Sequence, residues 1–264
     1  MTKEKAIQPF VQWVGGKRKI ANQLMQYIPN GLNNYYEPFL GGGALFFHIR
    51  HLFNQCFLSD VNLDLVTSYN TIKNNPDEVH RQVMELNSKH TEDNYYRLSG
   101  GNYTNNPIGV TARFIYVNKH SFKGVFRINR KGQLKSTCNT RCWKGVDFDK
   151  TLEQCSRQLT GVTIYANDFS FITPAKDDFV YFDPPYHKAG ERFYTRLPFD
   201  ENEQIRLREF VTSLSDKDVK VMISNSDTDF IRDLYSDLDI TEIDINYAIN
   251  NKNAKELIIT NYQK

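Results

Sequence analysis

The residues Asp183, Pro184, Pro185 and Tyr186 place a carboxylate, a stiff turn and an aromatic ring at one point of the chain. They follow the apolar run 179–182, which is typical of a buried strand in a parallel sheet, so the acid falls where that strand ends. The two prolines cannot extend a hydrogen-bonded ladder, and they stiffen the backbone. Such a group can hold a planar molecule by its NH2 group and by its face. A plain strand followed by a proline turn is the simpler alternative.

A second candidate site begins at Gly41, Gly42 and Gly43, which lie between an expected strand over 35–39 and an expected helix over 44–53. Glycines at such a turn let the backbone bend tightly and let a ligand come close. Asp60 ends the next expected strand, over 55–59, where an acid can accept hydrogen bonds from ribose hydroxyls. Neither a G-x-G-x-x-G motif nor a P-loop motif is present, so the pattern favours a nucleoside without a pyrophosphate.

A third expected strand, over 162–166, is followed by Asn167, Asp168 and Phe169. Asp168 could bind an adenine amino group, and Phe169 could cover the adenine ring. Simple core packing is the equal alternative for Phe169.

Basic residues gather in one part of the chain. The net charge is only +2, but residues 111–146 hold nine basic residues and no acid, which leaves 24 basic and 31 acidic residues elsewhere, a net charge of −7. Five aromatic residues lie between the positive charges. This composition indicates a phosphate-binding surface, with a solvated basic face as the alternative. The nine are Arg113, Lys119, Lys123, Arg127, Arg130, Lys131, Lys135, Arg141 and Lys144.

The elements that position these residues form two α/β segments around a polar, mainly helical stretch. We therefore expect a first catalytic half over 1–73, an insert over 74–150 and a second catalytic half over 151–264. Asn62 is expected to cap a helix over 63–72. Further expected helices cover 77–89, 94–98, 110–119, 200–214 and 229–235, and further strands cover 219–223, 240–245 and 257–262. Residues 129–132 suit a type I turn, which predicts a basic hairpin around them.

Composition narrows the class of protein. Of the 264 residues, 40% are apolar and 24% are charged, as in ordinary globular proteins. No apolar run approaches the ~20 residues of a membrane helix, and the first residues do not suit a secretory signal, so we expect a cytoplasmic protein without membrane contact. The four cysteines and six histidines show no metal-ligand spacing, and we expect free thiols and no metal.

With these motifs in place, the chain resembles the Dam-type (D12 class, α group) DNA adenine-N6 methyltransferases over nearly its whole length. Residues 13–17 are similar to the family's W-x-G-G-K, residues 37–43 to its E-P-F-x-G-G-G, and 183–186 are its D-P-P-Y. Ser224-Asn225 and the ending 256–262 also match. The resemblance implies a Rossmann-like S-adenosylmethionine-dependent methyltransferase sheet with an inserted, mainly helical DNA-recognition domain that bears a basic hairpin.

The resemblance also implies S-adenosylmethionine as methyl donor, without a metal, and double-stranded DNA as partner, with no obligate protein partner evident. It carries over Trp13, Lys17, Asp60 and Asp183 as cofactor contacts, with the 37–43 turn beneath the methionine. The expected cofactor-binding residues are therefore Trp13, Lys17, Glu37, Phe39, Gly41, Asp60, Asp168, Phe169 and Asp183.

For catalysis, we expect the Asp183 carboxylate and the Pro184 carbonyl to accept the two N6 hydrogens of a flipped adenine, while Tyr186 stacks on the base. This localises the lone pair of an otherwise poor nucleophile. The methyl group then transfers in line from sulfur, and positioning contributes much of the rate.

Residues 122–129 resemble the family's recognition hairpin, with Arg127 as the residue that reads a guanine. GATC is the commonest family target and the first expectation here. Two departures bear on it: residues 135–139 differ from the usual N-x-P-F-G, and Gln12 replaces a common Lys before Trp13, which favours an adenine contact. The expected DNA-binding residues are Gln12, Lys123, Arg127, Asn129, Arg130 and Lys135.

Two alternatives remain at this point. The chain could methylate another amino group on the same fold, such as cytosine N4, although such enzymes more often carry Ser or Asn where this chain has Asp183. It could also be a catalytically silent DNA-binding homologue. Restriction-modification, replication or repair marking, and phage self-protection are not distinguished, and a bacterial or phage-encoded protein in the host cytoplasm fits all three.

Overall fold

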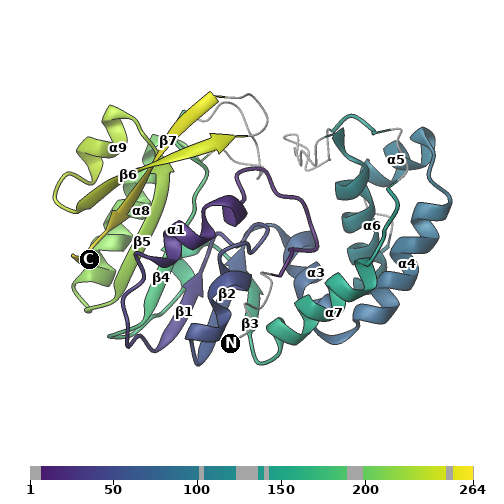
Figure 1. The fold of residues 1–264 in the computed structure, drawn as a ribbon, viewed down its shortest axis with the longest axis horizontal. Helices are drawn as coiled ribbons and strands as arrows, with labels where there is room; N and C mark the ends of the chain where they lie inside the picture. Colours follow the sequence, from purple (N-terminus) through teal and green to yellow (C-terminus); the bar gives the residue numbers. More distant parts are fainter. Residues whose placement is uncertain are drawn as a thin grey trace.

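The structure, a computed structural model, describes residues 7–100, 104–122, 136–139, 143–188, 199–247 and 252–263. A seven-stranded sheet forms one part of the molecule, and a group of helices from the middle of the chain forms the other (Figure 1). The strands are β1 (Asn34–Glu37), β2 (Gln55–Asp60), β3 (Thr163–Ala166), β4 (Phe179–Phe182), β5 (Lys220–Ser226), β6 (Asp239–Tyr247) and β7 (Lys252–Thr260).

The sheet has the order β3-β2-β1-β4-β5-β7-β6. Its first five strands are parallel, and β7 runs antiparallel to both β5 and β6. Because β1 lies between β2 and β4, the carboxyl ends of these three strands meet at one edge of the sheet, where α/β proteins commonly bind ligands. The expected Rossmann-like α/β class is confirmed, and Glu37, Asp60 and Asp183 are brought to this edge.

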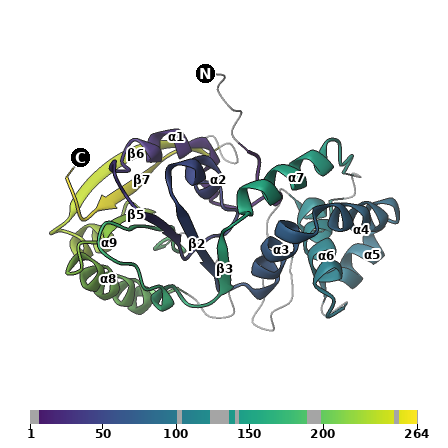
Figure 2. The ribbon, with the colours of Figure 1, turned by 90° about the horizontal axis from the view of Figure 1, so that it is seen from below.

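The helices are α1 (Ala21–Met25), α2 (Phe46–Ile49), α3 (Leu63–Asn74), α4 (Pro76–Ser88), α5 (Glu92–Ser99), α6 (Pro107–His120), α7 (Phe148–Leu159), α8 (Glu201–Ser215) and α9 (Asp229–Leu234). Short 3-10 helices cover Lys17–Lys19, Arg50–Leu52 and Phe169–Phe171. Helices α1 and α2 lie on one face of the sheet, and α8 and α9 lie on the other (Figure 2). None of the helices in the described ranges has the length and apolar character that crossing a bilayer requires.

Alternating strand residues pack into two hydrophobic clusters, one on each face of the sheet. Tyr35 and Tyr181 belong to the cluster beneath α1 and α2, while Tyr36, Val180 and Phe182 belong to the cluster beneath α8 and α9. The period of two is the geometry of a strand, and burial on both faces explains the apolar run at β4.

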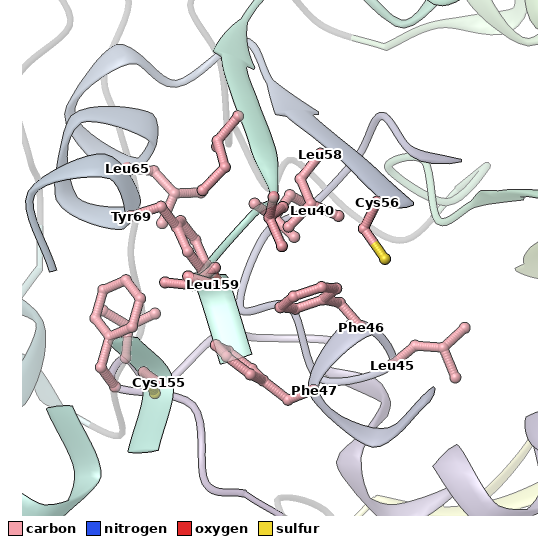
Figure 3. Close-up of a cluster of buried hydrophobic side chains, with 14 of the residues drawn as sticks. Leu40, Leu45, Phe46, Phe47, Cys56, Leu58, Leu65, Tyr69, Cys155 and Leu159 are labelled. Carbon is pink, nitrogen blue, oxygen red and sulfur yellow. The ribbon is translucent and has the colours of Figure 1, made fainter. Parts of the chain in front are cut away.

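The first of these clusters continues into the helical part of the molecule. Figure 3 shows Phe46 of α2, Leu58 of β2, Tyr69 of α3 and Leu159 of α7 within it. Buried side chains of α4 and α6 belong to the same cluster: Val79, Val83, Ala112, Phe114 and Ile115. The division into three segments remains a prediction, and its boundary at residue 150 falls inside α7.

Local predictions can be compared with these elements. The Oδ1 atom of Asn62 accepts the N–H of Leu65 at 3.1 Å, which confirms the expected cap of α3. The helix expected over 44–53 is shorter and ends in the 3-10 turn Arg50–Leu52. Helix α7 was not predicted, although its buried residues recur at helical spacing: Phe148, Leu152, Cys155 and Leu159. The expected hairpin around 129–132 lies outside the described residues.

Candidate active site

The Asp183 carboxylate, just after β4, forms an ion pair with Lys17. The Nζ atom of Lys17 lies 2.7 Å from Oδ1 of Asp183, and the two side chains are 4% and 20% exposed. The same ammonium group donates to the carbonyl of Gly15 at 2.9 Å and lies 4.8 Å from the ring centre of Tyr186. The lysine therefore joins the acid to the ring of the proline turn and ties both to the segment that follows Trp13.

The proline turn is held from behind by two buried amides. Gln204 of α8 donates from Nε2 to the carbonyl of Pro185 at 2.9 Å, and Asn225 of β5 donates from Nδ2 to Oε1 of Gln204 at 3.0 Å. Neither amide side chain is exposed to solvent. Of the described residues, none donates a hydrogen bond to the carbonyl of Pro184. The turn thus satisfies one proline carbonyl internally and leaves the other as an available acceptor.

Tyr186 is fixed at its far end by an acid from β7. Its hydroxyl donates to Oε2 of Glu256 at 2.8 Å, and Glu256 is buried. The ring is thereby anchored at its hydroxyl while Lys17 lies over it. Glu256 enters the site because β7 pairs with β5, a long-range contact that sequence spacing could not predict.

Trp13 packs directly against the glycine turn. A Cβ atom on Gly41 would lie 2.6 Å from Nε1 of Trp13, and one on Gly42 would lie 3.0 Å from its Cβ. Gly41 has a φ of +48° and Gly43 a φ of +63°, both in the left-handed region that glycine tolerates best. The predicted turn therefore requires glycine for its backbone shape and for the indole that covers it.

Asp60 connects the end of β2 to that turn. Its Oδ2 atom accepts the N–H of Gly41 and its Oδ1 atom accepts the N–H of Asn62, each at 2.9 Å. Burial raises its pKa, while these backbone hydrogen bonds oppose the rise. The backbone of Val61 also donates to this carboxylate, which still leaves it acceptor capacity for a further hydrogen bond.

Burial strongly raises the pKa values of two acids at this edge of the sheet. Burial raises the pKa of Glu37 to about 8, although its Oε2 atom accepts a hydrogen bond from the Tyr35 hydroxyl at 2.8 Å. Burial also raises the pKa of Asp183 to about 6, and the neighbouring Lys17 opposes that rise. Clustered acids with shifted pKa values are typical of functional sites.

Asp168 and Phe169 are engaged within the protein. Both guanidinium Nη atoms of Arg206 donate to the Asp168 carboxylate at 2.8 Å, which holds the pKa of that acid well below its usual range. Phe169 is 2% exposed, stacks on Phe39 with 5.4 Å between ring centres, and lies 4.0 Å from the Arg206 guanidinium carbon. Core packing thus describes Phe169, and cofactor contacts by Asp168, Phe169 and Phe39 stay predictions.

Most of the predicted DNA-binding residues lie in segments outside the described ranges. Lys123, Arg127, Asn129, Arg130 and Lys135 lie outside the described residues, while the Gln12 side chain is exposed.

Three of the nine basic residues between 111 and 146 lie in the described ranges: Arg113, Lys119 and Lys144, of which Lys144 is exposed. Arg113 is buried and forms an ion pair with Asp64. Lys119 lies near the Trp143 and Phe148 rings, and burial lowers its pKa to about 8. Arg113, being buried and paired, does not fit the DNA-facing surface that all nine basic residues were expected to form.

The described cysteines are possible metal ligands or disulfide partners by their side-chain chemistry. Cys56, Cys138 and Cys155 are buried free thiols, as expected. Within the described ranges, no group of three or more His, Cys, Asp or Glu side chains could hold a metal ion. That the chain works without a metal stays a prediction.

Known proteins are similar to this chain over most of its length. The family model for D12 class N6 adenine-specific DNA methyltransferases matches residues 13–249. Type II methyltransferase M1.LlaDCHI of Lactococcus lactis subsp. cremoris is 32% identical, over 97% of this chain and 96% of its own. Type II methyltransferase M.MjaIII of Methanocaldococcus jannaschii is 30% identical, over 97% and 99%. DNA adenine methylase of Escherichia coli (strain K12) is 28% identical, over 86% and 83%.

Proposed function

The chain belongs to the D12 class N6 adenine-specific DNA methyltransferases, and on that premise we propose that Asp183 and Pro184 hold the adenine amine that it methylates. The observation that carries the proposal is the position of Asp183. Its carboxylate is paired with Lys17, at the sheet edge that the glycine turn also borders. An acid turned away from that edge would have left one of the two N6 hydrogens without its proposed acceptor.

The chemical task is to make a poor nucleophile react. The adenine N6 lone pair is delocalised into the ring, so the amine must be bent toward tetrahedral geometry before it attacks. The Asp183 carboxylate and the Pro184 carbonyl are the two acceptors that would take one N6 hydrogen each and stabilise positive charge as it develops. The Gln204 hydrogen bond to Pro185 supports this role, because it fixes the turn through the neighbouring carbonyl.

The residues at the sheet edge fit S-adenosylmethionine, which supplies an electrophilic methyl group bound to sulfur. Gly41 and Gly42 form a bend in which a side chain would collide with Trp13, so the absence of side chains lets the indole pack against the turn beside which the cofactor would bind. Asp60 would offer its remaining acceptor capacity to a ribose hydroxyl. We assign Trp13, Lys17, Glu37, Phe39, Gly41, Asp60 and Asp183 to the cofactor contacts, with Asp168 and Phe169 at the adenine ring.

The substrate we propose is double-stranded DNA with the target adenine flipped out of the helix. Within a duplex, N6 is paired and stacked, so the base must leave the stack before Asp183 can reach it, at a cost of a few kcal/mol. Tyr186, anchored by Glu256, would stack on the flipped base and offset part of that cost. Basic residues of the 123–135 segment would contact phosphates, and Arg127 would read a guanine within GATC or a related short site.

We further propose that the chain works without a metal ion or an obligate protein partner, in the cytoplasm where it meets its DNA. Positioning and the two acceptors supply the chemistry, so no Lewis acid is needed in this scheme. Magnesium-free buffer with a chelator is expected to leave methyl transfer intact, and a loss restored by one added metal would overturn this part of the proposal.

The test replaces Asp183 by Ala and, in a matched variant of the same volume, by Asn. We expect Asp183→Ala to fold, to keep DNA binding and to lose methyl transfer by at least about 100-fold, the scale on which such electrostatic groups act. Transfer is measured with a labelled donor, followed by nucleoside digestion and mass detection of the product. Near-normal transfer in Asp183→Ala would remove this acid from the mechanism. N4-methylcytosine in the wild-type digest would overturn the assigned substrate base.

A further inference from the structure

The backbone of Gln12 is held at both of its polar groups by one side chain of the helical insert. Its N–H donates to Oδ1 of Asn118 at 2.9 Å, and its carbonyl accepts from Nδ2 of Asn118 at 2.8 Å. Asn118 lies in α6 and is not exposed to solvent. Two hydrogen bonds to one peptide residue fix both its position and its orientation, across 106 positions of sequence.

Helix α6 also carries the base of the predicted recognition segment. Directly after the helix, Ser121 forms an antiparallel bridge with Cys138, and the N–H of Phe122 donates to the carbonyl of Thr137 at 2.8 Å. The chain therefore enters and leaves 123–135 at neighbouring points, both fixed to the end of α6. DNA bound to that segment would therefore act on α6 first, through the residues at the base of the segment.

Residues 12–17, which we call the connecting segment, reach three parts of the molecule within six residues. Gln12 is bound to α6, Trp13 covers Gly41, and Lys17 is paired with Asp183. The N–H of Gly16 donates to the carbonyl of Trp13 at 3.1 Å, so the segment is folded back into a compact turn. Trp13 follows Gln12 directly, so no intervening residue can accommodate a shift of Gln12 before Trp13 moves.

We infer that Asn118 is a positioning residue that links DNA binding by the insert to cofactor binding at the glycine turn, through the connecting segment. The inference rests on the proposed function for its two ligands. Each ligand then changes the affinity of the protein for the other, and by the same factor in both directions. The link needs both hydrogen bonds, because they hold the two peptide groups on either side of the Gln12 Cα atom. Either bond alone would leave the other peptide group able to rotate.

The experiment measures this factor directly. The dissociation constant of S-adenosylhomocysteine, a probe that cannot donate a methyl group, is determined with and without a saturating duplex that the wild-type protein methylates. We expect the duplex to tighten the wild-type affinity by at least about fivefold, the lower end of typical coupling. In Asn118→Leu, which has similar volume and neither hydrogen bond, the probe alone should bind within about twofold of wild type, while the effect of the duplex falls below about twofold.

Asn87→Leu is the matched control. Asn87 is also a buried asparagine of the insert, and its hydrogen bonds to the carbonyl of Trp143 at 3.0 Å and to His120 at 2.9 Å do not reach the connecting segment. It should lose stability as Asn118→Leu does and yet keep the wild-type factor. If Asn118→Leu does not fold, Asn118→Asp decides, because it retains an acceptor for the Gln12 N–H and loses the donor. Its factor should also fall below about twofold, because the link needs both hydrogen bonds.

The inference is overturned if wild type shows no effect of the duplex on probe binding, or if the Asn118 variants keep the full effect. It is also overturned if Asn87→Leu loses the effect equally, since general loosening of the insert would then be the cause. Failure of the proposed function looks different, because the wild-type protein would then leave no N6-methyladenine in any duplex.

Discussion

The Nζ atom of Lys17 lies 2.7 Å from Oδ1 of Asp183, and this pair joins a segment near the start of the chain to the end of β4. Burial raises the pKa of Asp183 to about 6, and Lys17 opposes that rise. The acid must be ionised to accept an amine hydrogen strongly. The lysine therefore favours the ionised form of Asp183 close to neutral pH, which is the form that the proposed function requires.

Replacing Lys17 by Met should shift the acid limb of the pH–rate profile to higher pH. Without the ammonium group the pKa of Asp183 rises above about 6, so the carboxylate protonates, and activity is lost, at a higher pH than in wild type. The measurement is kcat against pH with cofactor and DNA both saturating. Lys17→Arg, which keeps the charge, should hold the limb near its wild-type position. An unshifted limb in Lys17→Met would separate Lys17 from the ionisation of Asp183.

Glu37→Gln should change the pH dependence of folding stability. Burial raises the pKa of Glu37 from an ordinary value of 4.5 to about 8, so the folded protein keeps a proton that the unfolded chain releases. Wild type is therefore fully stabilised by this group below about pH 4.5 and loses that contribution as the pH rises through about 8. Glutamine does not ionise, so the variant should gain on the order of a few kcal/mol relative to wild type by pH 9.

Urea unfolding of Glu37→Gln and wild type at pH 5 and pH 9 measures this difference. Glu85→Gln is the control, because Glu85 is an exposed acid paired with Lys89 and has a lowered pKa. That variant should show no such trend between the two pH values. A constant stability difference between Glu37→Gln and wild type would mean that Glu37 is ionised throughout.

Gly41→Ala should weaken cofactor binding more than its backbone strain explains. Gly41 has a φ of +48° and its new Cβ would lie 2.6 Å from Trp13, whereas Gly31 has a φ of +77° and open space around it. Both alanine variants should lose about 1–2 kcal/mol of stability from left-handed strain. Displacement of the indole should weaken S-adenosylhomocysteine binding about tenfold in Gly41→Ala alone, a loss of about 1.4 kcal/mol. Titration calorimetry checks this, and equal binding by both variants would contradict it.

Arg127→Ala should relax discrimination at one base pair. A bidentate arginine–guanine contact contributes about 1–3 kcal/mol of discrimination against the wrong base. The measurement is kcat/KM on duplexes that vary one position of the site at a time. We expect one position to lose its preference while the others keep theirs. A uniform loss across all sequences would instead identify Arg127 as a phosphate contact.

Much of the fold followed from local patterns. The apolar run at β4 and the Asn62 cap predicted their elements because strand burial and capping depend on near neighbours. Helix α7 was missed even though its apolar residues recur at helical spacing. The basic stretch before it led us to end the insert at residue 150, which falls inside this helix. The length of α2 was overestimated, because a 3-10 turn continues the same apolar spacing.

Part of the site was also predicted from local sequence patterns. Asp60 and Asp183 were placed at strand ends by sequence alone, and both lie at the sheet edge. Trp13 and Lys17 came only from the family resemblance, since a tryptophan and a lysine near a glycine pair carry no chemistry by themselves. Gln204 and Asn118 had no signal at all, because each acts through hydrogen bonds that cross many positions of the chain.

Attempts to give this enzyme a new target site are best directed at a short graft rather than a whole transplanted module. Leu58 of the sheet shares one continuous apolar interior with Val79 and Phe114 of the insert, so cutting the insert out would open that interior on both sides. The chain between Phe122 and Thr137, by contrast, is closed at its base by a backbone hydrogen bond. Exchanging residues 123–135 with those of a relative would leave Leu58, Val79, Phe114 and the other described members of that interior in their wild-type form.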